Sequence, residues 1–189
     1  MERCIPRTEK TAIVTCCYDL VAMRKVLVIG PGGAGKSTLA TQLGELLNIE
    51  VLHLDKFYWQ PGWIETPKSE WLVTVGELVR RDSWVMDGNY SGTLDVRYKA
   101  CDTVIFLDMS RTICLWRVLK RAIIYRRKRR PDMAEGCPER LTVEFILWIW
   151  NYPRRTRPKI VRMLESHSDK KIVWLRSQSD VERFLARHQ

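Results

Sequence analysis

The apolar positions of this chain alternate between two patterns. Short runs rich in Val and Ile are separated by longer stretches in which apolar residues recur every three or four positions, as on one helix face. The short runs predict strands at 25–29, 51–54, 84–87, 103–108 and 171–175. Nearly continuous apolar strands that alternate with helices are typical of a parallel sheet covered on both faces. The pattern therefore predicts an α/β fold.

Polar residues and prolines mark the ends of the expected helices. Ser110 can cap a helix that runs through Ile123 into a basic segment. A later helix is expected over 138–151, with Pro153 beyond its end. Ser179 and Glu182, three positions apart, have the spacing of a capping box before the last helix.

Length and composition fit one globular domain. The 189 residues are 46% apolar and 29% charged, and one domain holds roughly 100–200 residues. No uncharged apolar run reaches the roughly 18 residues that a membrane span needs, so we expect no membrane partner. Met23 and the two basic residues after it resemble a natural start. We therefore interpret 1–22 as an N-terminal extension, either disordered or not native, and 23–189 as the domain.

Positive charge is concentrated in two places. The net charge is +10, and residues 117–130 hold eight basic side chains and no acid. Residues 154–162 hold five more, again without an acid. Such clusters suit a polyanionic ligand, but they also occur on solvated helix faces. Composition leaves both interpretations open.

Cysteine usage points to a reducing compartment. None of the six cysteines forms a C-x-x-C pair, and the chain has only three histidines, so neither a zinc site nor a disulfide framework is indicated. We expect reduced thiols in a cytoplasmic protein. The cysteines are Cys4, Cys16, Cys17, Cys101, Cys114 and Cys137.

A phosphate-binding loop is the strongest motif. Residues 30–38 read GPGGAGKST, which fits G-x-x-x-x-G-K-[ST] between a predicted strand and a predicted helix. Glycines let successive amides point at phosphate oxygens, and the helix start adds its positive end. Lys36 reaches the β and γ phosphates, and Ser37 ligates Mg²⁺. The residues expected to bind the nucleotide are Gly30, Gly32, Gly33, Ala34, Gly35, Lys36, Ser37 and Thr38.

A nucleotide bound with Mg²⁺ also needs a nearby carboxylate. Asp87 and Asp108 both end predicted strands. Asp108 follows four apolar residues, as in a generic Walker B strand, whereas Asp87 precedes a glycine that allows close approach to phosphate. These patterns alone do not choose between the two. The chain has no N-K-x-D motif, which argues against a Ras-type GTPase.

The segment after the second predicted strand is a candidate acceptor site, placed at about 55–82. Asp55 would face the ligand crevice at the carboxyl end of its strand and could orient an acceptor hydroxyl or take its proton. Tyr58 and Trp59, with the aromatics beside them, could wall a ring. They could equally pack a small subdomain.

Several arginines are candidates for stabilising a transferring phosphoryl group. The irregular stretch 129–138 is long for a plain connection, and we expect a lid at about 126–140. Arg121 and Arg126 flank it and are predicted to be catalytic together with Lys36 and Asp55. Arg97 is expected to hold the acceptor.

Taken together, these motifs resemble those of the adenylate-kinase-like P-loop proteins of the topology modulation, or FlaR-related, family. The resemblance spans about residues 25–175 and implies a P-loop NTPase three-layer fold, nucleoside- or nucleotide-kinase-like, with a short lid and strand order 2-3-1-4-5. The stretches that carry it are GPGGAGKSTLA, HLDKFYWQPGW, WVMDGNYSGTLDVR, TVIFLDMSRTICLWRVLKR, RRPDMAEGCPERL and FILWIWNYPRR.

The resemblance also bears on the site. Asp87-Gly88 is similar to the start of the D-G-x-P-R stretch of adenylate kinases, which favours Asp87 as the magnesium-side residue. The proline and arginine of that stretch are absent here, which puts AMP as acceptor in doubt, and Arg97 lies further on as a substitute. The D-x-F-Y stretch that begins at Asp55 is similar to uridine-kinase-type enzymes, which phosphorylate a hydroxyl.

Together these features predict an ATP- and Mg²⁺-dependent phosphotransferase. Its partner would be a small-molecule acceptor, with a nucleotide or nucleoside favoured by the resemblance. An alternative is an ATP-binding, DNA-associated regulator with little kinase activity, which the basic segment supports but no helix-turn-helix, zinc-finger or RNA-binding signature accompanies. A third is an inactive nucleotide-binding scaffold. The oligomeric state is not indicated by the sequence.

Overall fold

The core of the protein is a five-stranded parallel sheet. The computed structural model describes residues 23–126, 130–166 and 170–187, so the proposed extension 1–22 lies outside the described residues. The strand order is β2-β5-β1-β6-β7, which confirms the expected order 2-3-1-4-5 for the five sheet strands in chain order. The strands are β1 (Lys25–Ile29), β2 (Val51–His53), β5 (Trp84–Asp87), β6 (Thr103–Leu107) and β7 (Lys171–Leu175).

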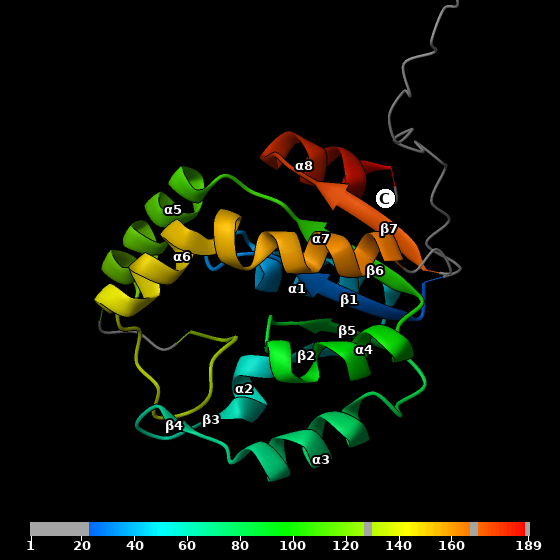
Figure 1. Ribbon diagram of the computed structural model, residues 1–189, viewed down its shortest axis with the longest axis horizontal. Helices are drawn as coiled ribbons and strands as arrows, with labels where there is room; N and C mark the ends of the chain where they lie inside the picture. The colour runs from blue at the N-terminus through cyan, green and yellow to red at the C-terminus, as the bar shows by residue number, and fades with distance from the viewer. Residues whose placement is uncertain (1–22, 127–129, 167–169, 188–189) are drawn as a thin grey trace, which may run out of the picture.

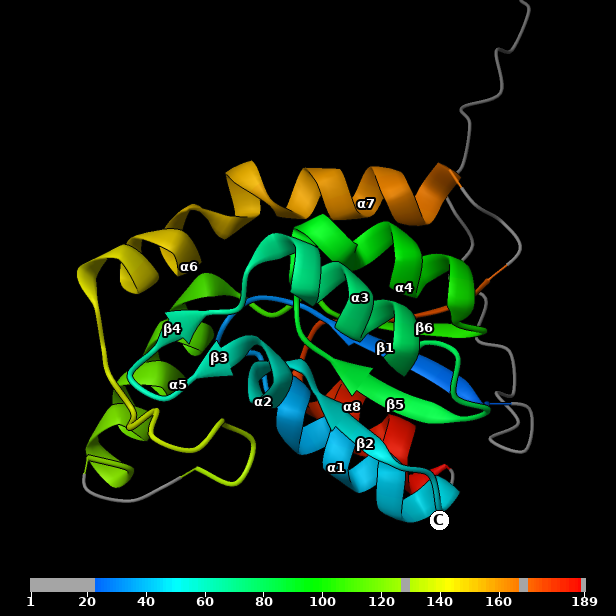
Figure 2. The same cartoon turned by 90° about the horizontal axis from the view of Figure 1, so that it is seen from below.

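Helices cover both faces of this sheet, as Figure 2 shows most clearly. One layer holds α1, α5 and α8, and the other holds α3, α4 and α7. Side chains along β1 alternate between the layers, because Val26 and Val28 face the first and Leu27 and Ile29 face the second. The helices are α1 (Lys36–Leu47), α3 (Lys68–Leu78), α4 (Leu94–Ala100), α5 (Arg111–Ile124), α6 (Val143–Arg155), α7 (Arg157–Ser166) and α8 (Gln178–Ala186).

The register of the sheet prepares the site. Strand β1 is central, and Val28 pairs with Asp87 on β5 and with Ile105 on β6. On the other side of β5, Asp87 pairs with His53 at the end of β2. The carboxyl ends of these strands therefore bring Asp87 and His53 beside the loop that leaves β1.

Two helix ends differ from the expectation. The expected helix over 138–151 is α6, which begins only at Val143, where the Thr142 hydroxyl accepts from Phe145 N at 3.2 Å. It also continues through Pro153. Proline usually interrupts a helix, but Tyr152 and Ile149 of this helix are buried in the cores of the two layers. Tertiary packing thus outweighs the local preference.

The last helix uses a different capping box from the predicted one. Ser177, not Ser179, is the N-cap of α8, and its hydroxyl accepts from Asp180 N at 3.1 Å. The Asp180 carboxylate accepts in return from Ser177 N at 2.9 Å. The expected cap at Ser110 is confirmed, because its hydroxyl accepts from Ile113 N at 3.4 Å at the start of α5.

The region after β2 contains elements that the pattern did not reveal. The second strand ends at His53 and passes directly into a short helix, α2 (Leu54–Tyr58). An antiparallel hairpin of β3 (Trp59–Gln60) and β4 (Ile64–Glu65) follows. A 3-10 turn (Ser91–Thr93) and helix α4 follow β5 and were likewise not predicted.

The hairpin lies against the irregular segment between α5 and α6 (Figure 1). Gly62 N donates to Gly136 O at 3.0 Å, and Trp63 Nε1 donates to Pro138 O at 3.1 Å. Residues 130–142 form no helix or strand. We call residues 130–141 the lid segment below, after the lid expected at about 126–140, of which 127–129 lie outside the described residues. Two stretches about 75 residues apart in sequence are thus joined beside the sheet edge.

Candidate active site

The loop between β1 and α1 has the backbone that its glycines predict. Gly33 has φ +79, a left-handed conformation that favours glycine. A Cβ atom there would lie 2.4 Å from the carbonyl oxygen of Cys114 on α5. Helix α1 begins at Lys36, as expected. Its first amides are therefore free to face an anion.

Two side chains that were not predicted hold this loop in place. Asn89 binds Gly30 twice, since its Oδ1 accepts from Gly30 N at 3.2 Å and its Nδ2 donates to Gly30 O at 2.6 Å. From the other side, Arg117 of α5 donates to Ala34 O at 3.0 Å. Part of the basic segment is therefore used to fix the loop.

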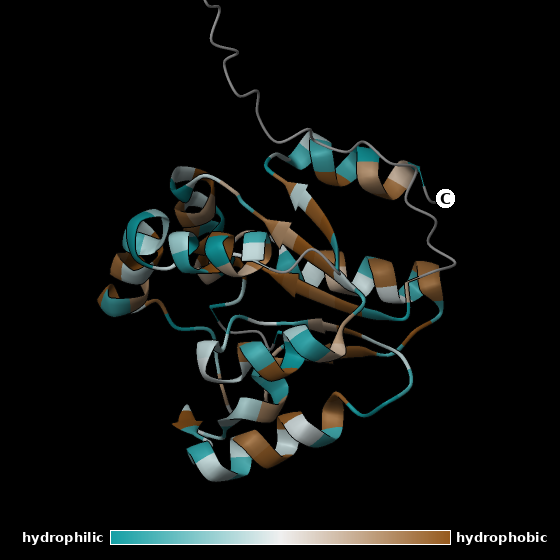
Figure 3. Cartoon of the chain, turned by 45° about the vertical axis from the view of Figure 1, so that its right-hand side comes forward, coloured by the Kyte–Doolittle hydropathy of each residue, from teal (hydrophilic) through white to brown (hydrophobic). Residues whose placement is uncertain are grey.

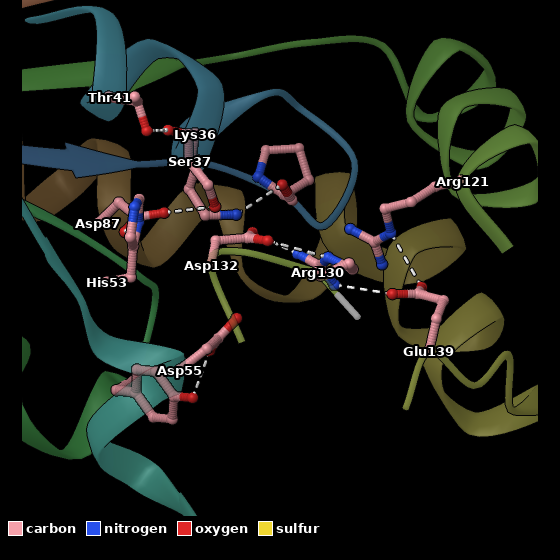
Figure 4. Close-up of polar contacts among 12 residues, drawn as sticks. Lys36, Ser37, Thr41, His53, Asp55, Asp87, Arg121, Arg130, Asp132 and Glu139 are labelled. Carbon is pink, nitrogen blue, oxygen red and sulfur yellow. Dashed lines mark hydrogen bonds and ion pairs between the residues drawn. The ribbon is translucent and has the colours of Figure 1, made fainter. Parts of the chain in front are cut away.

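Lys36 lies inside the loop and donates from Nζ to Pro31 O at 3.0 Å (Figure 4). Burial lowers the pKa of Lys36 from its ordinary value, although Asp87 and Asp55 oppose that shift. The ammonium therefore sits between a backbone carbonyl and two carboxylates. An incoming phosphate would offer it a stronger partner than the carbonyl does.

Asp87 lies at the end of β5 between two polar partners. Ser37 Oγ donates to Asp87 Oδ2 at 2.7 Å, and His53 Nδ1 lies 2.7 Å from Asp87 Oδ1. Asp108 instead accepts from Nε and Nη2 of Arg157, both at 2.8 Å. The geometry thus supports Asp87 as the carboxylate beside the phosphate loop. His53 was not predicted, although it ends the strand two residues before Asp55.

Asp55 lies in the first turn of α2, and its side chain points toward Lys36 and Asp87 (Figure 4). Its Oδ1 accepts from the hydroxyl of Tyr90 at 2.5 Å. Burial raises the pKa of Asp55, and Asp87 raises it further, while Tyr90 and Lys36 act in the opposite direction. A carboxylate with a raised pKa is suited to accept a proton near neutral pH.

Arg97 has a different position from the one expected. Its side chain is completely buried, and it donates to the carbonyl oxygens of Gly88 and Asn89 at 2.8 Å and of Tyr90 at 2.9 Å. Burial lowers the pKa of Arg97 to about 10. The guanidinium is occupied by the chain that carries Asn89 and Tyr90, so in this structure it does not reach an acceptor.

Arg121 and Arg130 are linked through one carboxylate. Arg121 Nε donates to Glu139 Oε1 and Arg130 Nη1 donates to Glu139 Oε2, both at 2.9 Å. Arg130 also binds Asp132 through two hydrogen bonds. Arg126 is exposed, and no hydrogen bond or ion pair of its side chain is present among the described residues. The structure thus brings Arg121 and Arg130 together and leaves Arg126 apart.

Asp132 is the residue of the lid segment that lies beside the phosphate loop, residues 30–38. Burial disfavours its ionised form, but the bonds from Arg130 outweigh burial and lower the pKa of Asp132, with a contribution from Ser37. Figure 4 shows Asp132 next to Ser37, on the side where Asp55 also points. A carboxylate from the lid segment therefore occupies the neighbourhood of the phosphate loop, and Arg130 accompanies it.

The aromatic residues form one connected set, because the rings of Tyr58 and Trp59 lie 5.0 Å apart. Tyr58 packs against Tyr90, with ring centroids 4.5 Å apart, close to Asp55. At the other end of this set, Trp59 and Trp63, 5.2 Å apart, pack against Met133, Ala134 and Cys137 of the lid segment. Trp59 therefore serves the contact between hairpin and lid segment, which is the packing alternative left open by the sequence.

Searches by sequence give no relative. No protein-family model matches the chain, and no curated protein matches it.

Among the described residues, no group of three or more His, Cys, Asp and Glu side chains is arranged to hold a metal ion.

The comparison with solved structures identifies the class of fold. A shikimate kinase from Acinetobacter baumannii, solved with shikimate, superposes with TM-score 0.53 at 17% identity, covering 88% of this chain and 90% of that chain. A shikimate kinase from Bacteroides thetaiotaomicron gives TM-score 0.53 at 14% identity, covering 88% and 96%. This chain therefore has the fold of P-loop kinases. At these identities the likeness concerns the fold alone.

Proposed function

We propose that this protein is an ATP-dependent phosphotransferase that transfers the γ-phosphoryl group of Mg-ATP to a hydroxyl of a small molecule. The observation that carries the proposal is the position of Asp55. Its carboxylate has a raised pKa and interacts electrostatically with Lys36 of the phosphate loop and with Arg130 of the lid segment. A candidate base thus points toward the candidate phosphate site (Figure 4).

The phosphate loop and Lys36 would bind the triphosphate. When phosphate oxygens replace the Pro31 carbonyl as the hydrogen-bond acceptor of Lys36, the ammonium gains an anionic partner. This offsets the free-energy cost of burying its charge. Ser37 and Asp87 supply a hydroxyl and a carboxylate, the oxygen ligands that Mg²⁺ accepts when substrate phosphates complete its shell. When bound, the metal neutralises charge on the phosphates. His53 would keep Asp87 oriented.

Asp55 would accept the proton of the acceptor hydroxyl, and Tyr90 would hold its carboxylate in place. Arg121 and Arg130 would stabilise charge on the transferring group. Arg126, predicted for the same task, would have to turn in from its exposed position. Arg130 replaces it in the proposal because it interacts electrostatically with Asp55.

A nucleoside or nucleotide remains the favoured acceptor by resemblance to the topology modulation family. Tyr58, beside Asp55 and Tyr90, is the aromatic placed to contact its ring. The commitment of Arg97 to backbone carbonyls removes the cation that was expected to bind an acceptor phosphate. This favours an uncharged nucleoside over a nucleoside monophosphate.

The test is coupled ADP release from Mg-ATP with a panel of nucleosides, nucleoside monophosphates and duplex DNA. The expected result is ADP release with a nucleoside, lost by at least about a hundredfold in Lys36→Ala and in Asp55→Asn. Asp82→Asn, an exposed loop carboxylate, is the matched control and should keep full activity.

Other outcomes of this assay are equally informative. Release only with a monophosphate would keep the kinase but make Asp55 a positioning residue. Turnover by Asp55→Asn near the wild-type rate would overturn its role as base. No release with any small molecule, together with hydrolysis stimulated by DNA, would overturn the kinase and favour the DNA-associated regulator.

A further inference from the structure

Large apolar side chains are exposed on the outer side of α5 and α6. Trp116 and Ile123 on α5 are 60% and 77% exposed, and Val143 and Leu147 on α6 are 66% and 52% exposed. Figure 3 shows the two helices together at one end of the molecule, with apolar segments on both. We call the following set the outer apolar surface: Ile113, Trp116, Leu119, Ile123, Ile124, Val143, Leu147 and Trp150.

The spacing of these residues makes each helix apolar on two sides. Cys114 and Val118 of α5 are buried in the core, whereas Trp116 and Ile123, seven positions apart, share the outer side. None of the residues of the outer apolar surface belongs to either hydrophobic core. Water contact with these side chains is unfavourable, so the surface is a candidate for an interaction.

The outer apolar surface belongs to two neighbouring helices (Figure 1). The guanidinium of Arg111, at the start of α5, lies 4.0 Å from the ring centre of Trp150, near the end of α6. At the opposite end, Arg121 of α5 is tied to Glu139, which precedes α6. The two helices therefore run antiparallel.

Positive charge accompanies this surface. Between Asp108 and Asp132 the sequence has nine Lys and Arg residues and no acid. Arg117, Arg121 and Arg130 bind groups of the protein itself. Lys120, by contrast, is exposed with its ammonium 5.1 Å from the ring centre of Trp116, and Arg126 is exposed at the end of α5. On α6, the exposed acidic residue Glu144 follows Val143 of the outer apolar surface directly.

Exposed Trp, Ile and Leu with Lys and Arg among them match the headgroup region of an anionic bilayer. A nucleic acid would use the basic groups but would leave the aliphatic ones in water. A second copy of the chain would set like charges against each other. We propose that the outer apolar surface docks the protein peripherally on an anionic lipid bilayer.

This is a surface contact and not a span, since no helix within the described ranges is long and apolar enough to cross a membrane. It revises the expectation of no membrane partner, which rested on the absence of a span. The proposal does not depend on the kinase function, because none of the outer apolar surface residues belongs to the proposed site.

The test is cosedimentation with vesicles of phosphatidylcholine alone or with about one third phosphatidylglycerol. We expect binding to the anionic vesicles, at least about tenfold weaker binding to the neutral ones, and loss of binding as salt increases. Trp116→Ser with Ile123→Ser should weaken binding about tenfold or more, as should Lys120→Glu. Leu72→Ser with Val73→Ser, which are exposed on α3, should not.

Circular dichroism melting of each variant shows whether it is folded, and any acceptor-dependent ADP release that the assay described above detects should be the same in all of them. Equal binding to both vesicle types, or binding unchanged by Trp116→Ser with Ile123→Ser, would overturn the proposal. So would an absence of vesicle binding together with dimerisation that the same double variant abolishes, which would make this face an interface between copies. Binding to duplex DNA but to neither vesicle would overturn it in favour of nucleic acid.

Discussion

Asp55 is the residue whose protonation state decides most in the proposed reaction. Burial raises its pKa above the ordinary aspartate range, so it is protonated, and unable to accept a proton, up to a higher pH than an exposed aspartate. We expect kcat/KM to fall as the pH drops through that raised pKa, on an acidic limb displaced upward. A pH profile with the acceptor that the ADP-release assay identifies measures this, and a flat profile across the acidic range would contradict it.

The same raised pKa has a consequence for stability. The ionised carboxylate is disfavoured in the folded state, so the contribution of Asp55 to stability is lost as the pH rises through its folded pKa. Asp55→Asn should therefore melt at a higher temperature than wild type at neutral pH, with the difference shrinking toward acid pH. The exposed control Asp82→Asn should show no such pH-dependent gain.

Glu139 is a second residue with an effect beyond its own position. Its side chain is 2% exposed and binds both Arg121 and Arg130, whose charges repel each other. Glu139→Gln removes the charge that holds the two guanidinium groups together. We expect kcat to fall roughly tenfold to a hundredfold, because the arginines lose their alignment with the phosphoryl group, with little change in the KM for ATP.

The control for this prediction is Glu144→Gln, an exposed glutamate in the first turn of α6. It should leave kcat unchanged. A Glu139→Gln enzyme with normal kcat would show that Arg121 and Arg130 do not act on the transferring group.

At the scale of elements, the hairpin and the lid segment act as one unit. Gly136 has φ +69, and a Cβ atom there would lie 2.8 Å from Pro61 Cβ in the hairpin. Gly136→Ala should weaken this contact by more than about 1 kcal/mol. We expect faster trypsin cleavage in the lid segment and a raised KM for ATP, because Asp132 and Arg130 lose their position over the phosphate loop.

Gly76→Ala is the matched substitution, since a Cβ there meets open space in α3 and φ is not positive. Its cleavage pattern should equal that of wild type. Unchanged cleavage in Gly136→Ala would show that the lid segment keeps its place without the hairpin.

The elements also show where pattern reading works. The short apolar runs predicted β1, β5 and β7 to the residue, because buried strands are defined by their own composition. Helix α4 and the hairpin were missed. Arg97 supports its segment by donating to Gly88, Asn89 and Tyr90, and the two-residue strands are held by the lid segment. Neither interaction leaves a periodic signal in the sequence.

At the scale of the whole molecule, the basic residues of α5 and of the start of the lid segment have three different environments. Arg117 fixes the phosphate loop, Arg121 and Arg130 face Glu139 beside the site, and Lys120 and Arg126 remain on the surface. Composition offered a polyanion site or a solvated helix face as alternatives. The structure divides the basic side chains between internal contacts and the surface, because α5 runs from the phosphate loop to the lid segment and presents a different side to each.

The five sheet strands and the loop of residues 30–38 could be predicted from the amino-acid sequence alone. Strand composition and the GPGGAGKST motif are local signals, and the conformations they require depend on adjacent residues. The sequence also placed Lys36, Ser37, Asp55 and Asp87 at the site, which remains a proposal supported by their geometry.

The side chains that surround these residues could not be predicted, because they come from distant parts of the chain. His53 meets Asp87 through strand register, Tyr90 meets Asp55 across 35 positions, and Arg130 meets Glu139 where the lid segment folds back. The burial of Arg97 in the interior was likewise not predicted. Charged and polar groups are long-reaching and find partners wherever the packed chain brings them, so their pairing depends on contacts between distant segments that no local pattern records.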